Sequence, residues 1–185
     1  MKELSLNVLD VAKNSVKAKA TLIGISLEET EETLTLTVTD NGCGMTAEIL
    51  RGVIDPFCTT RTTRKVGMGI PLLKMAAEQT GGGIEISSTL DDGTGSPHGT
   101  VLSAQFFKDH IDFTPLGDVT SSVVTLIQGH PDTDFLFLHR KDGGEVRLDT
   151  RELREALEGV PLNTYDVLKW IEGYLEEQYE ELNKN

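Results

Sequence analysis

The sequence predicts an α/β (α+β) fold, in which helices pack against a β-sheet. Residues 3–18 carry apolar and small side chains at spacings of three and four, the pattern of a helix with one buried face. The next two runs, 21–27 and 33–38, are rich in β-branched and aliphatic residues and are separated by an acidic link, which predicts a hairpin. Helical and strand patterns are interleaved along the rest of the chain, as is typical of a mixed architecture.

The length and the cysteine content limit the protein class. A chain of 185 residues can hold one domain with a well-filled core, or one such domain with a small appendage. Cys43 and Cys58 are the two cysteines and form no CxxC pair, so we expect a reducing, cytoplasmic setting and no disulfide framework or zinc ribbon. No run approaches the roughly 20 apolar residues that a membrane helix needs, so no membrane association is expected.

The charge is strongly negative and unevenly placed. A net charge of −13 argues against nucleic-acid binding, because neutralising phosphates requires a basic face. Residues 1–110 hold 10 basic and 14 acidic side chains, whereas residues 111–185 hold 7 and 16. We therefore expect one domain over 1–110 and an acidic α+β extension over 111–185. Its acidic surface is interpreted as a solvated helical face, with a docking patch for a basic partner as the alternative.

A glycine-rich turn follows the second strand. That strand ends at Asp40, and residues 41–45 form a turn that glycine-rich sequence makes easily. Thr46 suits the N-cap of a short helix that ends near Ile54. The stretch 55–69 combines proline, threonines, basic residues and glycines with little periodicity. We expect a long surface loop there, of a kind that is usually functional or disordered.

The remaining elements follow from the same rules. A helix is expected over 68–80, stopped by three glycines at 81–83, and strands are expected over 84–90 and 99–107. In the C-terminal part, a helix is expected over 115–129, with a strand over 121–127 as the alternative. A hairpin of 135–139 with 146–148 follows. Two helices come last, one from a Thr150 cap to Leu157 and a final one capped by Thr164.

Four polar or glycine-rich signals occur in order and together describe a nucleotide site. They are Asp10-x-x-x-Asn14 on the first helix, Asp40-x-Gly42-x-Gly44 after a strand, a basic threonine-rich loop, and Gly67-x-Gly69 at the start of a helix. Each signal alone is weak, because a helical polar pair or a Gly-x-Gly turn is ordinarily surface. Their combination at these structural positions is what predicts the site.

Each signal has a chemical role in that hypothesis. Asp40, at a strand end beside glycines, can accept a hydrogen bond from the exocyclic amine of adenine. Gly67, Met68 and Gly69 lead into a helix, where free N–H groups and the helix dipole suit phosphates. Mg²⁺ prefers hard oxygen ligands, so Asn14 is the predicted metal ligand. Asp10, one turn earlier, can orient or deprotonate a nucleophile at the γ-phosphate.

These signals resemble the sequence boxes of the GHKL ATPases, the family of gyrase, the heat-shock chaperone, histidine kinases and MutL. Asp10 to Asn14 resembles the N box, residues 40–44 the G1 box and Asp55-Pro56-Phe57 the F box. Residues 65–70 resemble the G2 box, and Gly99-Thr100 is similar to the last box. Five boxes in order make the resemblance specific, and it covers about residues 3–107.

The resemblance implies a two-layer α/β sandwich with a mixed sheet, ATP with Mg²⁺ as ligands, and a mobile lid over residues 58–66. It assigns Asp10 as the catalytic residue. It places the following residues at the nucleotide, with Asn14 also holding the metal: Asn14, Lys17, Asp40, Gly42, Gly44, Met45, Phe57, Thr60, Arg61, Lys65, Val66, Gly67, Met68, Gly69, Ile70 and Thr100.

The function implied by the resemblance is an ATP- and Mg²⁺-binding protein that acts on a partner protein as a slow ATPase or a protein kinase, like histidine kinases or anti-sigma kinases. The alternative is a non-catalytic module whose lid controls partner docking when ATP binds. Family ATPases place a glutamate where this chain has Asp10, so fast hydrolysis is not expected. Self-phosphorylation is not expected either, because no helix with an acceptor histidine precedes the N box. Domains of this family commonly form dimers, so a homodimer is a further expectation.

Overall fold

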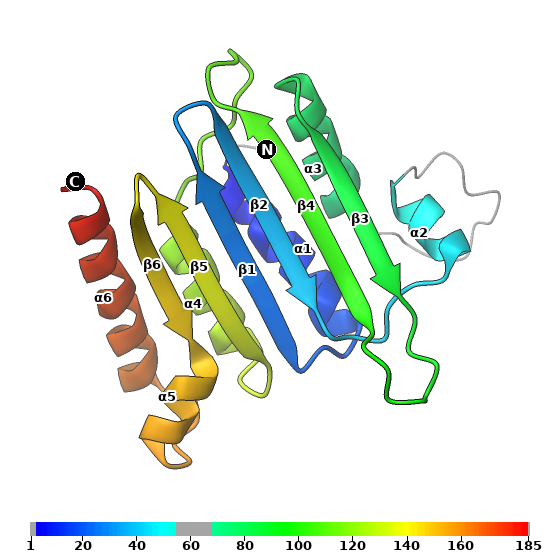
Figure 1. The fold of residues 1–185 in the computed structure, drawn as a ribbon. Coiled ribbons are helices and arrows are strands. Elements are labelled where there is room, and N and C mark those ends of the chain that lie inside the picture. Colours follow the sequence, from blue (N-terminus) through cyan, green and yellow to red (C-terminus); the bar gives the residue numbers. More distant parts are fainter. Residues whose placement is uncertain (1–2, 55–67, 185) are drawn as a thin grey trace.

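The fold is a six-stranded mixed sheet with helices packed on one face (Figure 1). The computed structural model describes residues 3–54 and 68–184. The helices are α1 (Leu4–Lys17), α2 (Ala47–Ile54), α3 (Gly69–Gln79), α4 (Val119–Gly129), α5 (Thr150–Leu157) and α6 (Tyr165–Leu182). The strands are β1 (Leu22–Glu29), β2 (Thr33–Asp40), β3 (Gly83–Thr89), β4 (Gly99–Phe107), β5 (Asp134–Lys141) and β6 (Gly144–Asp149). The predicted α/β fold class is confirmed.

The strand order β3-β4-β2-β1-β5-β6 makes the sheet mixed. Neighbouring strands are antiparallel except for β1 and β5, which run parallel with Ile25 opposite Phe137. This parallel pair joins the part of the chain before residue 110 to the part after it. One sheet therefore spans both regions.

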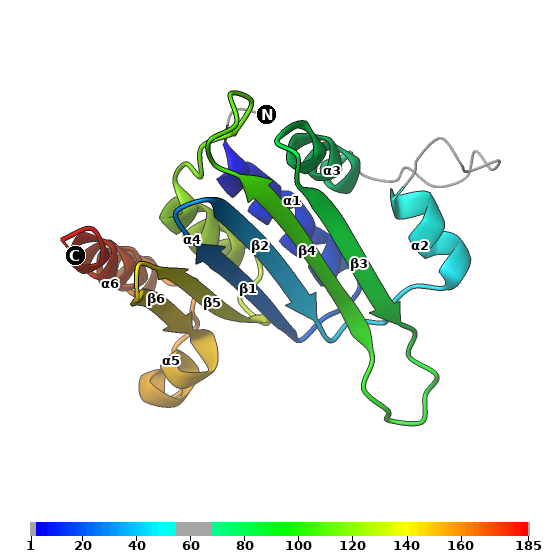
Figure 2. The same ribbon diagram turned by 45° about the horizontal axis from the view of Figure 1, so that its top comes forward.

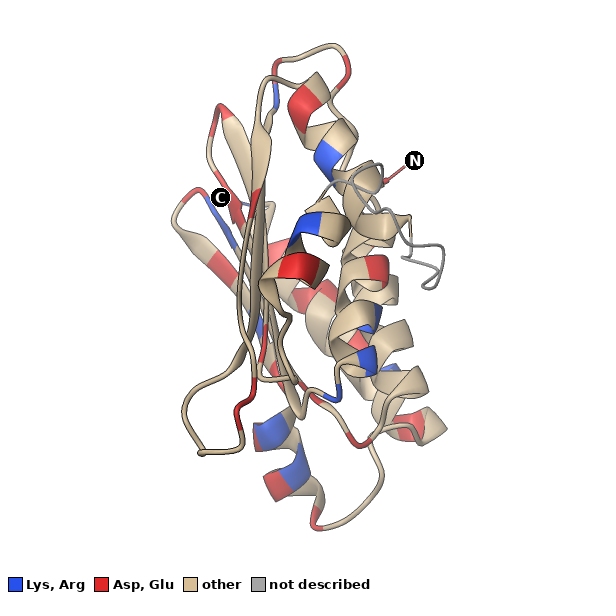
Figure 3. Cartoon of the chain, turned by 90° about the vertical axis from the view of Figure 1, so that its right-hand side faces the viewer, with Lys and Arg blue, Asp and Glu red and all other residues tan. Residues whose placement is uncertain are grey.

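The two faces of the sheet differ in chemistry because side chains alternate along each strand. On β1, Ile23, Ile25 and Leu27 point into the core, and helices α1, α3 and α4 cover that face (Figure 2). Helix α6 lies beside α4 and β6. The sheet viewed edge-on shows α1 and α3 on one side, with only strands and loops on the other (Figure 3). The threonines of β2 are on that open face, where Thr33, Thr35 and Thr37 are half-buried and Thr39 is exposed.

The region after residue 110 shares the hydrophobic core. Phe135 and Phe137 of β5 are fully buried and belong to the same apolar cluster as Ile23 and Ile25 of β1. Residues 119–129 form a helix, so the alternative strand there is wrong. The sheet and the core are continuous across residue 110, and the expected separation into a domain over 1–110 and an extension over 111–185 stays a prediction.

One of the three predicted helix caps needs correction, and a second holds its position without a side-chain hydrogen bond. Thr46 accepts from the Ile49 N–H as expected. The α5 cap is Asp149, whose carboxylate accepts from Arg151 N, while the buried Thr150 hydroxyl bonds Asp134 and Phe135 N. Thr164 occupies the N-cap of α6 without a side-chain hydrogen bond. The Thr150 hydroxyl thus meets buried tertiary partners before the helix end, whereas the buried Thr164 hydroxyl makes no hydrogen bond with the described residues.

Candidate functional site

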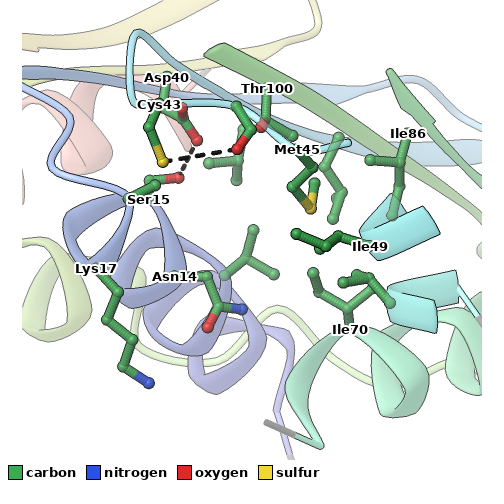
Figure 4. A pocket seen from close by; sticks show the side chains of 16 residues that line it. Asn14, Ser15, Lys17, Asp40, Cys43, Met45, Ile49, Ile70, Ile86 and Thr100 are labelled. Carbon is green, nitrogen blue, oxygen red and sulfur yellow. Dashed lines mark hydrogen bonds between the residues drawn. The ribbon is translucent and has the colours of Figure 1, made fainter. Parts of the chain in front are cut away.

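The main candidate site is a cavity of about 420 Å³ beside the end of β2, here named the Asp40 pocket (Figure 4). Helix α1 forms one wall, the inner face of β2, β3 and β4 forms another, and α2 and the start of α3 lie opposite. Its lining residues are Val11, Asn14, Ser15, Lys17, Ala18, Val38, Asp40, Cys43, Gly44, Met45, Ile49, Val53, Ile70, Ile86, Thr100 and Leu102.

The Asp40 carboxylate is held by two hydrogen bonds. The Ser15 hydroxyl donates to Oδ2 over 2.5 Å, and the Gly42 N–H donates to Oδ1 over 2.9 Å. Each carboxylate oxygen can accept a further bond, because it has two lone-pair positions. Asp40 is therefore oriented by α1 and by the turn, and it keeps acceptor capacity toward the pocket.

The turn after Asp40 is fixed by the β3–β4 hairpin. Met45 N donates to the Ser88 hydroxyl over 2.8 Å, and that hydroxyl lies 2.9 Å from Thr100 Oγ1. Cys43 O accepts from the backbone of residue 91 over 3.0 Å. Nδ1 of His98 donates to the Gly42 carbonyl oxygen over 2.6 Å. The turn is thus anchored at several points by strands that are distant in sequence.

The glycines of this turn are required by packing against backbone. Gly44 has φ +67°, and a Cβ there would lie 2.0 Å from the carbonyl oxygen of Thr89. A Cβ on Gly42 would lie 2.7 Å from the carbonyl oxygen of Ala18. The sequence predicts that these glycines admit a ligand. The structure gives them the additional and more direct role of seating the turn on α1 and β3.

The walls of the pocket are largely apolar, and its polar groups are few. Val38 and Leu102 are buried beneath it, and Ile49 and Ile70 approach from the two short helices. A planar heterocycle with an amino group fits this pocket. Its faces pack against the apolar walls, and its amino group faces the Asp40 carboxylate, which is an acceptor. Thr100 offers a hydroxyl nearby (Figure 4).

Asp10 lies beside the start of α3. It is exposed on α1, one turn before Asn14, and does not line the pocket. A Cβ added to Gly69 would lie 2.9 Å from the Asp10 Cβ and 3.5 Å from its Oδ2. Gly69 thus lets the start of α3, with its free N–H groups, approach the Asp10 carboxylate closely. Met68 is the N-cap of α3 and is 66% exposed.

The donor set for a cation is sparse. In residues 3–54 and 68–184, no three histidine, cysteine or acidic side chains come together as a metal cage. Asn14 is half-buried at the pocket wall and offers one amide oxygen. This fits Mg²⁺, which is commonly held by one or two protein groups together with phosphate and water oxygens.

The structure brings together most of the predicted residues that it describes. Asn14, Lys17, Asp40, Gly44, Met45, Ile70 and Thr100 line the pocket, Gly42 holds Asp40, and Gly69 contacts Asp10. Phe57, Thr60, Arg61, Lys65, Val66 and Gly67 lie outside the described residues, as does the lid over residues 58–66. Their roles stay predictions.

Several residues of the site were not predicted from the sequence. Ser15 follows Asn14 directly and could have been noticed as a polar residue on the buried helical face. Ile86 and Leu102 share the inward alternation of their strands. Ser88 and His98 carried no local signal, because their partners are Met45 and Gly42, more than 40 residues away.

Comparison with known proteins places this geometry in context. The profile of the family described as "Histidine kinase-, DNA gyrase B-, and HSP90-like ATPase" matches residues 2–108. The Staphylococcus aureus (strain NCTC 8325) sensor protein SrrB is 32% identical over 99 residues, which cover 51% of this chain and 17% of that protein. The curated sensor proteins that the chain matches are much longer, and the matched segments cover 14 to 17% of their lengths.

Two solved structures share the fold. The Aquifex aeolicus MutL ATPase domain complexed with ADP has a TM-score of 0.54 and 15% identity, covering 85% of this chain and 70% of that one. The N-terminal domain of a DNA repair protein has a TM-score of 0.51 and 14% identity, covering 80% of this chain and 53% of that one. Both coverages exceed the stretch matched by the family profile, so the shared fold includes part of the region after residue 108.

Among the described helices, none is long and apolar enough to cross a membrane.

Proposed function

Because this chain belongs to the family of histidine kinase-, DNA gyrase B- and HSP90-like ATPases, we propose that it binds ATP with Mg²⁺ in the Asp40 pocket and acts on a partner protein by slow hydrolysis or phosphoryl transfer. The observation that carries the proposal is the Asp40 carboxylate, held by Ser15 and Gly42 at the edge of a largely apolar cavity of about 420 Å³. Such a site is selective for a heterocycle that presents a hydrogen-bond donor.

Recognition of the base rests on Asp40 and the walls. The carboxylate accepts a hydrogen bond from the 6-amino group of adenine, and the apolar side chains of Ile49, Ile86 and Leu102 contact the ring faces. A 6-oxo purine would place an acceptor against the same carboxylate. Discrimination against guanine follows from that repulsion and the loss of a hydrogen bond.

The phosphates are assigned to the start of α3. The first N–H groups of a helix have no intrahelical partner and carry the positive end of its dipole. Lys17 and Asn14 line the same pocket from α1, so a cation and an amide oxygen are available. In this proposal Asn14 holds Mg²⁺ and Lys17 contributes positive charge.

Asp10 is assigned the role of orienting the attacking water or hydroxyl. It lies against Gly69 at the start of α3 and one turn from Asn14. A carboxylate at this place can accept the proton of the nucleophile. Aspartate is one methylene shorter than the glutamate of family ATPases, which accounts for the expectation of slow turnover.

The test is a calorimetric titration of ATP with Mg²⁺ into wild type and Asp40→Asn. The variant keeps the shape of the side chain but replaces an acceptor oxygen by a donor, so affinity should fall about 10- to 100-fold, as for loss of a hydrogen bond to a charged group. GTP should bind wild type far more weakly than ATP. Equal affinity of the variant, or the absence of wild-type binding, would contradict the proposal.

A second candidate, a regulatory module that binds ATP without turnover, is favoured by one observation: Asp10 is exposed and does not line the pocket. Phosphate release by wild type and Asp10→Asn separates the two candidates, with Asp109→Asn, an exposed site after β4, as the matched control. The enzyme predicts turnover that is lost only in Asp10→Asn while ATP binding is kept. The module predicts no turnover in any of the three proteins.

A further inference from the structure

A second hollow lies at the opposite edge of the sheet from α2 and α3, between α5 and α6 (Figure 1). We name it the α5–α6 groove, and its volume is about 370 Å³. It is lined by Leu153, Ala156, Leu157, Asp166, Val167 and Trp170. None of these residues lines the Asp40 pocket, so the groove is independent of the nucleotide site.

Trp170 lines this groove, and two more exposed aromatic side chains lie on the same helix. Trp170 is 52% exposed, and its ring stacks on Tyr174 with centroids 4.9 Å apart and an interplanar angle of 11°. Tyr165, at the start of the same helix, is 73% exposed. Tryptophan and tyrosine are the residue types that most often dominate the energy of protein interfaces. A stacked aromatic pair facing solvent therefore offers a contact surface for another polypeptide.

The basic side chains around the groove are already neutralised. Arg151 forms an ion pair with Asp149 at 2.7 Å, and Arg154 pairs with Asp134 at 2.7 Å. On α6, Lys169 pairs with Glu172 at 2.6 Å. These cations are therefore compensated by acids of the same chain.

Asp166, which lines the groove, and three further acids of the same region of sequence are not compensated in the same way. Asp166 lines it, Glu155 and Glu158 flank Ala156 and Leu157 in sequence, and Glu177 lies one turn beyond Tyr174 on α6. None of these four carboxylates forms an ion pair with any residue that the structure describes. Asp166 therefore places uncompensated negative charge at the apolar groove, and three further unpaired acids lie on the same two helices or at their ends.

We propose that the α5–α6 groove docks a basic amphipathic segment of a partner protein. An apolar side chain of that segment enters between Leu157 and Val167 against Trp170, and its lysines or arginines meet the free acids. Charge complementarity selects this occupant, because an anionic lipid surface, a nucleic-acid backbone and a second copy of the same acidic face would all be repelled. The segment resembles an amphipathic helix laid in a groove.

The single tryptophan of the chain makes the groove directly observable. Trp170 is the only tryptophan, so the intrinsic emission reports this surface. The probe is a synthetic amphipathic peptide of leucine and lysine, about 18 residues or five helical turns long. Saturable blue-shifted emission is expected with this peptide. A leucine–glutamate peptide should give no change, and a lysine–serine peptide should bind at least about tenfold more weakly.

Ala156→Arg tests the location of the binding. Ala156 is exposed, so the substitution places a long charged side chain in the groove without disturbing the core. Affinity for the leucine–lysine peptide should fall at least about tenfold. Ala47→Arg, at an exposed position of α2, is the matched control and should bind as wild type does.

Three results would overturn the proposal. Equal peptide affinity of the Ala156→Arg and Ala47→Arg variants would remove the groove as the site. Equal binding of the leucine–glutamate peptide would remove the charge argument. Sedimentation that shows a wild-type dimer without peptide, lost in Ala156→Arg, would assign the groove to a second copy.

Discussion

The Asp40 pocket and the α5–α6 groove are both apolar hollows with one carboxylate in the wall, yet they are built differently. In the pocket, Asp40 is held by two hydrogen bonds and its turn is anchored to a neighbouring hairpin. In the groove, the Asp166 carboxylate makes no hydrogen bond or ion pair with other described residues, and the walls are side chains on two helices. Fixed backbone suits one small ligand of defined shape, whereas adjustable side chains suit a polypeptide.

The largest predicted effect tests whether the two hollows share one folding unit. Phe137 is fully buried on β5, between the two hollows. Replacing it by alanine should lower the free energy of unfolding by about 3–5 kcal/mol. Because the core is continuous, denaturant unfolding should remain a single transition, with far-UV circular dichroism and Trp170 emission coinciding. Two separate transitions would show that the regions before and after residue 110 fold independently.

The second prediction concerns the rigid turn of the pocket. Gly44→Ala forces a Cβ into the Thr89 carbonyl oxygen, so the turn must move away from β3. The free energy of unfolding should therefore fall by about 2–4 kcal/mol, and ATP binding should be lost. The matched control is Gly93→Ala, which has a similar φ of +74° but no atom within 4 Å of the added Cβ. It should cost only about 1–2 kcal/mol and leave ATP binding intact. Equal effects would mean that backbone strain, rather than the contact with β3, sets the cost.

The third prediction concerns pH and the attachment of α6 at the far edge. His139 is buried on β5, with Nδ1 2.9 Å from the Tyr179 hydroxyl of α6 and Nε2 3.4 Å from a Glu29 carboxylate oxygen. Burial lowers the pKa of His139 below 6.5, and the Glu29 charge only partly opposes this. The unfolded chain therefore binds the proton more readily, and stability should fall as the pH drops below about 6.5, by up to about 1.4 kcal/mol per pH unit.

His139→Gln should flatten this pH dependence, measured as the slope of unfolding free energy between about pH 7.5 and 5.5. His110→Gln, at an exposed histidine, is the control and should keep the wild-type slope. Burial alone would raise the pKa of Glu29, but the hydrogen bond and charge of Lys108 lower it below 4.5. The contribution of Glu29 is thus lost only at lower pH, outside the measured window. An unchanged slope in His139→Gln would assign the dependence to other groups.

The smallest predicted effect concerns one hydrogen bond within the pocket. Ser15→Ala removes the hydroxyl that orients Asp40 but leaves the Gly42 N–H in place, so ATP affinity should fall about 2- to 10-fold. Ser26→Ala, on the open face of β1, is the control and should bind ATP as wild type does. A loss in Ser15→Ala as large as in Asp40→Asn would mean that Asp40 depends on Ser15 alone for its orientation.

Residues close in sequence were predictable because their interactions are local. The helical spacing of residues 3–18 and the alternation of 33–38 follow from the geometry of the elements themselves. The glycine turn after Asp40 and the start of α3 were recognisable for the same reason. Thr150 shows the limit of local rules, since its hydroxyl was expected at a helix end and lies instead in a buried contact with Asp134.

The sequence by itself determined the order and type of the elements, the candidate residues Asp10, Asn14 and Asp40, and the excess of acid after residue 110. Only the tertiary structure decided that β5 pairs with β1 and makes one sheet of the two regions, that Ser88 and His98 hold the turn beside Asp40, and that Trp170 and the unpaired Asp166 line one groove. The physical reason is the distance along the chain over which each kind of interaction acts. Periodicity and turn chemistry act over a few residues, whereas strand pairing and side-chain contacts across the core depend on how distant segments pack together.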